Sequence, residues 1–307
     1  MDYDIIIVGG GPAGLTAALY ALRANKKVLI TEKNTFGGQV TYSPKIENFP
    51  GFVSVSGNEL ADKLVDQVLS HGADVEIAEV TKIIDGEVKT VVTDIGSFTA
   101  GTVIIATGAK HRRLGLNNEE ELIGHGISFC AVCDGAFCNG KTVAVVGGGN
   151  SAMQEAILLT ENASKVYVIQ DLDFLTGEKK LAEQLKSNGK VEIITGSKVT
   201  ELIGDGDLKA ITVETMRTGE KARLDIDGLF VAIGLVPQNE AFTGLIEIDD
   251  AGYAVSDENC VTKTGGIFVA GDCRTKSVRQ IATAVADGAS AALAACKYLE
   301  NRGEKGE

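Results

Sequence analysis

The chain has 307 residues, of which 44% are hydrophobic and 23% are charged, a composition that favours a folded protein over a disordered one. Its net charge of −13 argues against nucleic acid or an anionic membrane as a partner, because both attract clustered Lys and Arg. No run approaches the roughly 18 apolar residues of a membrane helix, and no basic stretch precedes the first apolar run, so we expect a cytoplasmic protein without a signal peptide.

The chain opens with a strand–loop–helix–strand pattern. Residues 4–8 form a short apolar run that predicts a buried parallel strand. Residues 9–14 read Gly-Gly-Gly-Pro-Ala-Gly, here called the first glycine loop, and lead into a helical pattern over residues 15–24. Residues 27–31 predict a second strand that ends at Glu32. The pattern predicts a βαβ unit with the Gly-x-Gly-x-x-Gly spacing of dinucleotide-binding domains.

Each glycine of this spacing has a physical role in such a loop. Gly9 makes the tight turn, Gly11 lets a pyrophosphate approach the backbone, and Gly14 lets helix and strand pack closely. The helix N-terminus attracts phosphate, and Glu32 can accept hydrogen bonds from an adenosine ribose. The alternative is a glycine-rich turn that binds no nucleotide, but the flanking strand, helix and acid favour a dinucleotide site.

The same pattern returns later in the chain. Residues 141–146 predict a strand, and residues 147–152 read Gly-Gly-Gly-Asn-Ser-Ala, here called the second glycine loop. This loop opens a helix that continues to about residue 161, and residues 165–170 predict the next strand. The neutral Gln170 takes the position that Glu32 has in the first unit. Because the strands, the glycine loop and the helix are all present, the second unit predicts a site for a nicotinamide nucleotide.

The stretch that follows this strand bears on which nucleotide binds. Residues 166–178 contain no Lys or Arg but hold Asp171, Asp173 and Glu178. The 2′-phosphate of NADPH usually binds Arg or Lys, and each close acid would oppose it by about 1 kcal/mol at a surface-like dielectric. The alternative is a cation supplied from elsewhere in the fold, since two lysines lie just beyond the stretch.

Three further segments combine a short apolar strand pattern with glycine, at residues 103–108, 229–234 and 267–272. Ligands gather at the carboxyl ends of parallel strands, so these turns are candidates for binding. Residues 109–116 and 234–240 follow two of them and have the character of linkers. If both linkers are crossings between domains, the second nucleotide unit is inserted within the first domain.

Cys130 and Cys133 carry the most specific chemistry. Two cysteines at this spacing before a helix can form a redox disulfide, and the helix N-terminus can lower one thiol's pKa. Asp134 follows directly and could move a proton during dithiol–disulfide exchange. A zinc site and an inert pair of buried thiols are the alternatives, but the chain has only 3 His and no second Cys-x-x-Cys. The remaining cysteines are isolated, at positions 138, 260, 273 and 296.

Together these features resemble the low-molecular-weight thioredoxin reductase family of flavoprotein disulfide reductases, over essentially the whole chain. The most specific feature is the Cys-Ala-Val-Cys-Asp-Gly sequence of residues 130–135, placed inside the second nucleotide unit. The resemblance also rests on both glycine loops, Gly37-Gly38-Gln39, the Glu-Asn-Phe-Pro-Gly of residues 47–51, Ala106-Thr107-Gly108, Gly271-Asp272 and Arg279-Gln280.

The resemblance implies an α/β fold with two Rossmann-like dinucleotide-binding domains, the second inserted in the first. Residues 1–112 and 241–307 would form a discontinuous FAD-binding domain, and residues 113–240 a nicotinamide-nucleotide domain that carries the Cys pair. The residues implied to contact FAD are Gly9, Gly11, Pro12, Ala13, Gly14, Glu32, Lys33, Gly37, Gly38, Gln39, Asn48, Val80, Ala106, Thr107, Gly108, Gly271, Asp272, Arg279, Gln280 and Ile281. Those implied to contact the nicotinamide nucleotide are Gly147, Gly149, Asn150, Ser151, Ala152, Gln170, Ile233 and Gly234.

The resemblance further implies a thioredoxin-disulfide reductase. Two electrons would pass from NADPH or NADH through FAD and the Cys pair to thioredoxin or a thioredoxin-like protein. Cys133 would be the thiol next to the flavin, Cys130 the thiol that attacks the partner, and Asp134 the acid–base group. Family members work as homodimers and alternate between two domain orientations, for which the two linkers are suited.

The sequence departs from the family where the donor would bind. Members that use NADPH usually carry His-Arg-Arg and a further Arg after the strand that ends at residue 170, whereas residues 170–175 here read Gln-Asp-Leu-Asp-Phe-Leu. NADH, a weak NADPH site, or ferredoxin, as in some relatives without these arginines, are therefore alternatives. The intact second glycine loop favours a nucleotide. Related functions that remain open are a flavin-dependent dithiol oxidase, the flavoprotein of alkyl hydroperoxide reductase, and a non-enzymatic redox sensor.

Overall fold

The computed structural model describes residues 1–43 and 45–303 and divides the chain into two compact units. Unit 1 comprises Met1–Lys110 and Val236–Glu307, and unit 2 comprises His111–Leu235. The chain leaves unit 1 once and returns to it once, so unit 2 is a single uninterrupted segment.

Unit 1 is built on a mixed β-sheet. Its strands are β1 (Tyr3–Val8), β2 (Val28–Glu32), β3 (Asp74–Ile77), β4 (Val80–Ile84), β5 (Lys89–Thr93), β6 (Ser97–Ile105) and β17 (Ile267–Val269). The strand order is β3-β2-β1-β6-β5-β4, and β17 also pairs with β6. The pairings among β1, β2, β3, β6 and β17 are parallel, whereas the β4–β5 and β5–β6 pairings are antiparallel.

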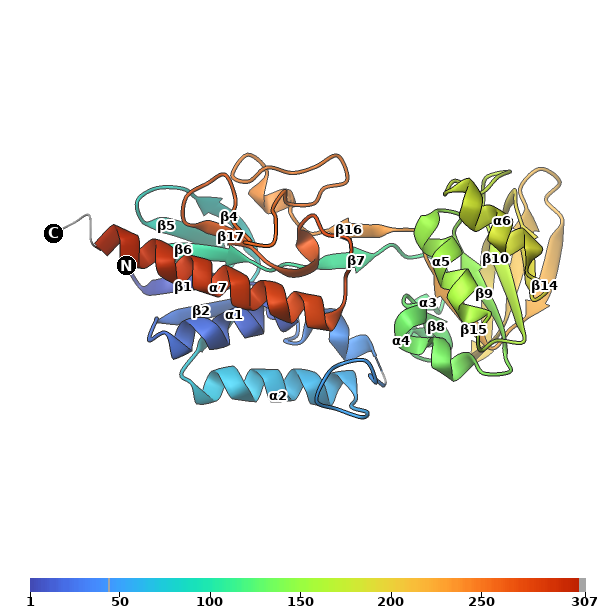
Figure 1. Cartoon of the computed structure of the whole chain (residues 1–307), viewed down its shortest axis with the longest axis horizontal. Helices are drawn as coiled ribbons and strands as arrows, with labels where there is room; N and C mark the ends of the chain where they lie inside the picture. Colours follow the sequence, from blue (N-terminus) through green and yellow to red (C-terminus); the bar gives the residue numbers. More distant parts are fainter. Residues whose placement is uncertain (44, 304–307) are drawn as a thin grey trace. The chain divides into compact units, whose positions relative to one another are not determined.

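Both faces of this sheet are covered, which explains the continuous apolar run of β1. Ile5 and Ile7 join one buried cluster with residues of α1 (Pro12–Arg23) and α7 (Ile281–Gly303), while Ile6 joins a second cluster on the opposite face. Helices α1 and α7 lie side by side, and α2 (Gly57–Ser70) packs against α1 (Figure 1). The first glycine loop is thereby held between β1 and α1.

Unit 2 repeats the arrangement around a parallel five-stranded sheet. Its strand order is β11-β10-β9-β15-β8. The strands are β8 (Ile127–Ser128), β9 (Thr142–Val146), β10 (Lys165–Ile169), β11 (Val191–Ile194) and β15 (Gly228–Val231), and all four pairings are parallel. Helices α5 (Asn150–Leu159) and α6 (Lys179–Ser187) pack against each other and on this sheet (Figure 1). The short helices are α3 (Glu119–Leu122) and α4 (Ala131–Asp134).

A separate antiparallel sheet completes unit 2. It consists of β12 (Ser197–Asp205), β13 (Asp207–Thr215) and β14 (Lys221–Asp225), in that order. The predicted α/β fold is confirmed, with a parallel βαβ unit around each glycine loop. The antiparallel sheet is an addition that the glycine loops do not predict.

The two linker segments form strands of their own. β7 (Ala109–His111) and β16 (Leu235–Pro237) pair as a two-stranded sheet at the point where the chain passes between the units. Residues 109–116 and 234–240, interpreted above as linkers, each contain one of these strands.

Candidate active site

The two cysteines of the Cys-x-x-Cys sequence are joined by a disulfide. The Cα atoms of Cys130 and Cys133 lie 5.3 Å apart, and the bond spans the first turn of α4. Cys130 is the N-cap of this helix, and its Sγ accepts a hydrogen bond from the Cys133 backbone N–H at 3.1 Å. The structure therefore holds the pair in the oxidised state from which a disulfide reductase begins its reductive half-reaction.

Asp134 lies directly beside this disulfide and is held by Ser128. The Ser128 hydroxyl donates to Asp134 Oδ2 at 2.5 Å and accepts from the Cys130 backbone N–H at 3.1 Å. Burial raises the pKa of Asp134, and the hydrogen bond from Ser128 opposes that rise. A carboxyl group with a raised pKa holds a proton more readily, so Asp134 has the property that an acid–base group for thiol exchange needs.

The first glycine loop leaves room for a ligand at one glycine and none at another. A Cβ atom on Gly14 would collide with the Gly9 carbonyl oxygen, and Gly9 itself has a φ of +112°. A Cβ on Gly11 would meet nothing within 4 Å. Glu32 Oε2 accepts a hydrogen bond from the Gly10 N–H at 2.8 Å, which fixes the end of β2 against the loop. The loop is thus tightly packed toward the sheet and open at Gly11.

Near the start of α7, two polar groups are buried without a partner among the residues that the structure describes. Asp272 Oδ1 and Arg279 Nε are buried without a hydrogen-bond partner within the described part of the chain. Burial raises the pKa of Asp272, while Lys276 and Arg279 act against it. The Arg279 guanidinium lies over the ring of Tyr253, 4.2 Å from its centroid. Buried groups of this kind normally have partners, so their arrangement suits a polar ligand in unit 1.

The second glycine loop has the same geometry as the first. A Cβ on Gly149 would meet only Thr176 Oγ1, at 3.9 Å, and the side chain of Gln170 lies against Gly148. Asn150 Oδ1 accepts from the Glu178 backbone N–H at 2.7 Å. The segment that follows β10 is therefore held over the N-terminus of α5.

Exposed acids and apolar side chains occupy the segment that follows β10. Asp171 and Asp173 are exposed, and Leu172 and Phe174 are exposed by 45% and 63%. The neighbouring Lys179 forms an ion pair with Glu183 one turn along α6, at 3.8 Å. The segment thus presents negative and apolar groups beside the second glycine loop.

The predicted site residues divide cleanly between the units. Every residue predicted to contact FAD lies in unit 1, and every residue predicted to contact the nicotinamide nucleotide lies in unit 2, together with Cys130, Cys133 and Asp134. Sequence reasoning missed Ser128, which contacts Asp134 only because β8 brings it there. A serine six residues before an aspartate gives no signal of that contact.

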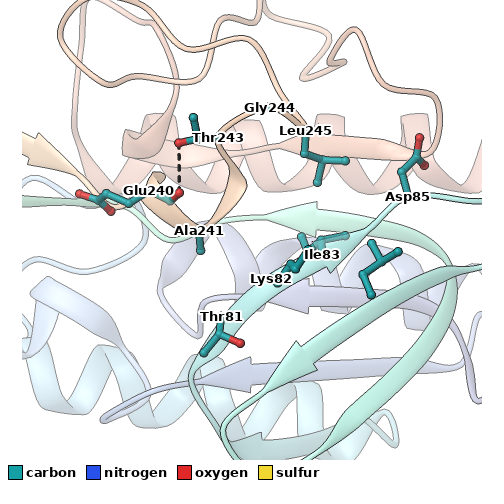
Figure 2. Close-up of a pocket in the computed structure, with 10 residues that line it drawn as sticks. Thr81, Lys82, Ile83, Asp85, Glu240, Ala241, Thr243, Gly244 and Leu245 are labelled. Carbon is teal, nitrogen blue, oxygen red and sulfur yellow. Dashed lines mark hydrogen bonds between the residues drawn. The ribbon is translucent and has the colours of Figure 1, made fainter.

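A hollow in unit 1 lies away from these features. It is bordered by β4 and by the segment that starts with η3 (Glu240–Phe242), and Figure 2 shows Lys82, Ile83 and Leu245 along it. None of the predicted site residues lines this hollow. We therefore assign the candidate site to the disulfide and the glycine loops.

Residues 1–43 and 45–303 contain no group of three or more His, Cys, Asp or Glu side chains placed to hold a metal ion. No helix within these ranges combines the length and apolar character needed to cross a membrane.

Comparisons with known proteins agree on one family. The model of the family described as pyridine nucleotide-disulphide oxidoreductase matches residues 3–288. Thioredoxin reductase of Listeria innocua is 44% identical over 301 residues, covering 97% of this chain and 94% of that protein. Thioredoxin reductase of Bacillus subtilis is 41% identical over 300 residues, covering 97% and 95%.

Solved structures show the same likeness in three dimensions. The crystal structure of thioredoxin reductase from Streptococcus pyogenes matches with a TM-score of 0.93 at 42% identity, covering 97% of this chain and 98% of that one. Similarity of this extent, in a chain that also forms the Cys-x-x-Cys disulfide, leads to one assignment. The chain belongs to the low-molecular-weight thioredoxin reductases, flavoprotein oxidoreductases of the pyridine nucleotide-disulphide oxidoreductase family.

Proposed function

We propose that the chain reduces the disulfide of thioredoxin, or of a thioredoxin-like protein, with NADH as the electron donor. The observation that carries this proposal is the Cys130–Cys133 disulfide with Asp134 beside it, in the same unit as an open nucleotide-type loop. The names of the similar proteins support thioredoxin as the substrate. We also propose a homodimer in the cytoplasm, and the molar mass in solution, expected to be twice 32.1 kDa, tests the dimer.

The residues of unit 1 fit FAD. The open space at Gly11 suits a pyrophosphate at the N-terminus of α1, Glu32 suits a ribose, and the unpartnered groups of Asp272 and Arg279 suit polar atoms of the cofactor. When bound, FAD supplies a ring system that accepts two electrons from a nicotinamide and passes them to a disulfide.

The cysteines and Asp134 would carry out the exchange with the partner. Two electrons break the Cys130–Cys133 bond, leaving a thiolate on Cys133 and, once a proton is taken up, a thiol on Cys130. Cys130 passes its proton to the ionised Asp134 and attacks one sulfur of the partner disulfide, which forms a mixed disulfide. The partner thiolate that is released takes this proton back from Asp134. Cys133 then attacks Cys130 Sγ, which reforms the internal disulfide and releases the reduced partner. The partner thus gains both electrons and leaves as one thiol and one thiolate, and the thiolate takes its proton from solvent.

The loop after β10 favours NADH over NADPH. A 2′-phosphate would face Asp171 and Asp173 instead of arginines, at about 1 kcal/mol for each close acid, which corresponds to roughly 30-fold for two. We expect NADH to bleach the flavin of the anaerobic enzyme at low concentrations at which NADPH does not. The Asp171→Arg variant should improve bleaching by NADPH more than bleaching by NADH. Glu220→Arg makes the same charge change on the turn between β13 and β14 and should not alter the preference between the two nucleotides.

Other results would support a different electron donor or a different activity. Equal bleaching by both nucleotides would mean that cations outside this loop bind the phosphate. Bleaching by reduced ferredoxin alone would contradict a nucleotide donor and support the ferredoxin-dependent alternative. Oxygen consumption with small dithiols, without turnover of thioredoxin, would support a dithiol oxidase.

A methyl group at Gly11 tests the placement of FAD. Gly11 has a φ of −82°, which alanine adopts freely, and its Cβ would enter open space. We expect Gly11→Ala to fold normally but to weaken FAD binding by roughly tenfold or more, because the methyl occupies the space of the pyrophosphate. FAD content and circular dichroism measure the two properties separately.

The matched control is the same change in the other unit. Gly149 has the same φ of −82° and similarly open surroundings. Gly149→Ala should therefore retain FAD and weaken only the binding of the nucleotide donor. Unchanged FAD affinity in Gly11→Ala would remove the first glycine loop from the FAD site.

A further inference from the structure

A second carboxyl group, on a half-buried residue, lies on the helix that packs against α4, and the exchange described above does not use it. Glu155 is on α5 and accepts a hydrogen bond from the backbone N–H of Ala131, the residue after Cys130. Its Oε2 atom is buried and has no hydrogen-bond partner in the described ranges. A half-satisfied buried carboxylate is costly, so the neutral acid is favoured at this position.

Burial governs the ionisation of Glu155. It raises the pKa of this side chain to about 7, and the Ala131 N–H opposes the rise. The elements that pack against α5 are α4, α6, β9, β10 and η2 (Gly135–Cys138). Their titratable groups outside the disulfide are Asp134, Cys138, Lys165, Tyr167, Lys179, Lys180, Glu183 and Lys186. None of these described groups contributes to the shift, so Glu155 changes charge near neutral pH through burial.

The position of Glu155 links two functional features along one helix. Helix α5 begins at Asn150 in the second glycine loop, and its second turn carries Glu155. The hydrogen bond to Ala131 joins this turn to the first residue of α4, whose N-cap is Cys130. The backbone between the two cysteines is therefore held by α5.

We propose that Glu155 is a positioning residue that also couples reduction of the Cys130–Cys133 disulfide to one additional proton. It holds the Ala131 N–H in both redox states. Reduction adds two electrons, breaks the S–S bond and leaves one thiol and one thiolate after uptake of a proton. A thiolate disfavours a second negative charge nearby, so Glu155 binds its proton more tightly in the reduced state than in the disulfide state.

The charge of Glu155 affects the redox equilibrium only toward higher pH. Well below pH 7 Glu155 is neutral in both states and does not alter the equilibrium between disulfide and dithiol. Above pH 7 its negative charge opposes the thiolate, so the wild-type pair becomes harder to reduce than a pair beside a neutral side chain. We expect the wild type and Glu155→Gln to be equally reducible at pH 6, with Glu155→Gln about fivefold more reducible at pH 8.

The test uses the complete flavoprotein in equilibrium with a dithiol/disulfide buffer between pH 6 and pH 8. Glu155→Gln keeps a side-chain carbonyl for the Ala131 N–H but cannot titrate. Glu161→Gln makes the same chemical change on an exposed carboxyl group just after α5 and should match the wild type throughout. Glu155→Ala removes both the acceptor and the charge, and should also speed alkylation of the reduced cysteines because the backbone is released.

Two results would overturn the proposal. One is a pH profile of Glu155→Gln that is identical to that of the wild type at pH 8. The other is a lower thermal stability in both Glu155 variants without any change in the redox equilibrium, which would assign a purely structural role. Because Glu155→Gln is nearly isosteric, it remains informative even if Glu155→Ala does not fold.

Discussion

Replacing Cys133 with serine should abolish reduction of the thioredoxin disulfide, with kcat/KM lowered by about 10⁴-fold or more, because the internal disulfide that carries the electrons can no longer form. Cys130→Ser should have an effect of the same size. Both variants should retain FAD, because every residue proposed to hold FAD lies in unit 1 and both cysteines lie in unit 2. Thioredoxin-dependent turnover and the flavin absorbance of the purified protein measure the two properties.

The chain supplies a matched control in Cys138. This thiol lies in the same unit, in η2, but is free and buried, and burial raises its pKa to about 11. It is therefore protonated and unreactive at neutral pH, and Cys138→Ser should keep full activity. Activity that survives in Cys133→Ser, or is lost in Cys138→Ser, would mean that the electrons take a different route through the cysteines.

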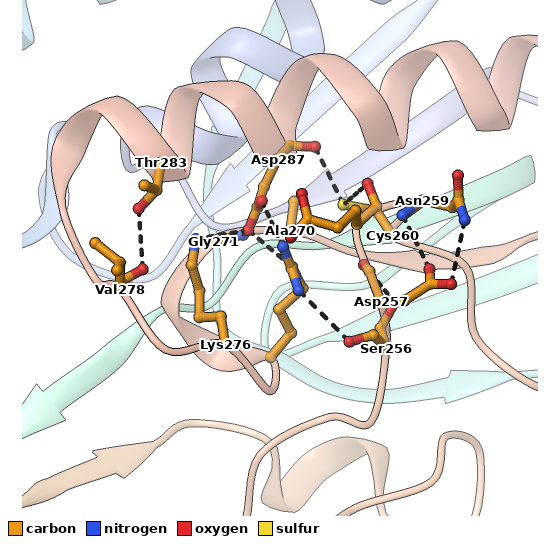
Figure 3. Close-up of polar contacts among 12 residues, drawn as sticks. Ser256, Asp257, Asn259, Cys260, Ala270, Gly271, Lys276, Val278, Thr283 and Asp287 are labelled. Atoms are coloured by element: carbon orange, nitrogen blue, oxygen red, sulfur yellow. Dashed lines mark hydrogen bonds and ion pairs between the residues drawn. The ribbon is translucent and has the colours of Figure 1, made fainter.

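The second large effect is expected at Asp287, in unit 1. Its carboxylate accepts from Arg274 Nε and Nη2 at 2.8 and 2.7 Å, from Lys276 Nζ at 2.9 Å, and from the Gly271 N–H at 3.0 Å. Figure 3 shows the side chain of Asp287 reaching from its helix toward Gly271 and Lys276. The side chains of Arg274, Lys276 and Asp287 are 5%, 6% and 9% exposed, so water does not replace these partners.

Asp287→Ala should therefore lower the free energy of unfolding by about 3–5 kcal/mol, because it leaves two buried cations and one N–H without their acceptor. Burial alone would raise the pKa of Asp287, but the hydrogen bonds from Arg274 and Lys276 outweigh it and the pKa is lowered. The carboxylate is thus ionised at neutral pH, and the loss applies there in full. Denaturant unfolding of the FAD-free protein separates this effect from loss of the cofactor.

An exposed ion pair in the same unit provides the comparison. Lys63 pairs with Glu59 on α2 at 3.5 Å, and both side chains are more than half exposed. Lys63→Ala should hardly change stability, because exposed pairs contribute little. A change for Asp287→Ala as small as that for Lys63→Ala would mean that the buried cations find other acceptors.

The sequence was most informative where both sides of an element are buried. Residues 4–8 predict β1 because Ile5, Ile6 and Ile7 are fully buried between two clusters, so no polar position interrupts the run. The glycine loops could also be predicted from the sequence. At Gly9 and Gly14, for example, close packing or a positive φ allows few residues other than glycine. Where burial or backbone conformation limits a position to a few residue types, a single sequence is enough to show the pattern.

Elements that lie at the surface leave a weaker pattern. The strand β14 has four exposed residues and one half-buried residue, so neither a continuous nor an alternating apolar run marks it. Glu155 shows the same limit for side chains, since it follows Gln154 on α5 and only the packing of α4 decides which of the two is buried. Contacts between separate elements require the folded chain.

The paired strands β7 and β16 have a consequence for the history of such a chain. Arg112 N donates to Gly234 O at 3.0 Å, and Gln238 N donates to Gly108 O at 3.3 Å, so the entry to and the exit from unit 2 lie side by side. Unit 2 is thus a single segment inserted between two neighbouring points of its host domain. A module with neighbouring ends can be gained, lost or exchanged at that turn without changing the strand order of the host sheet.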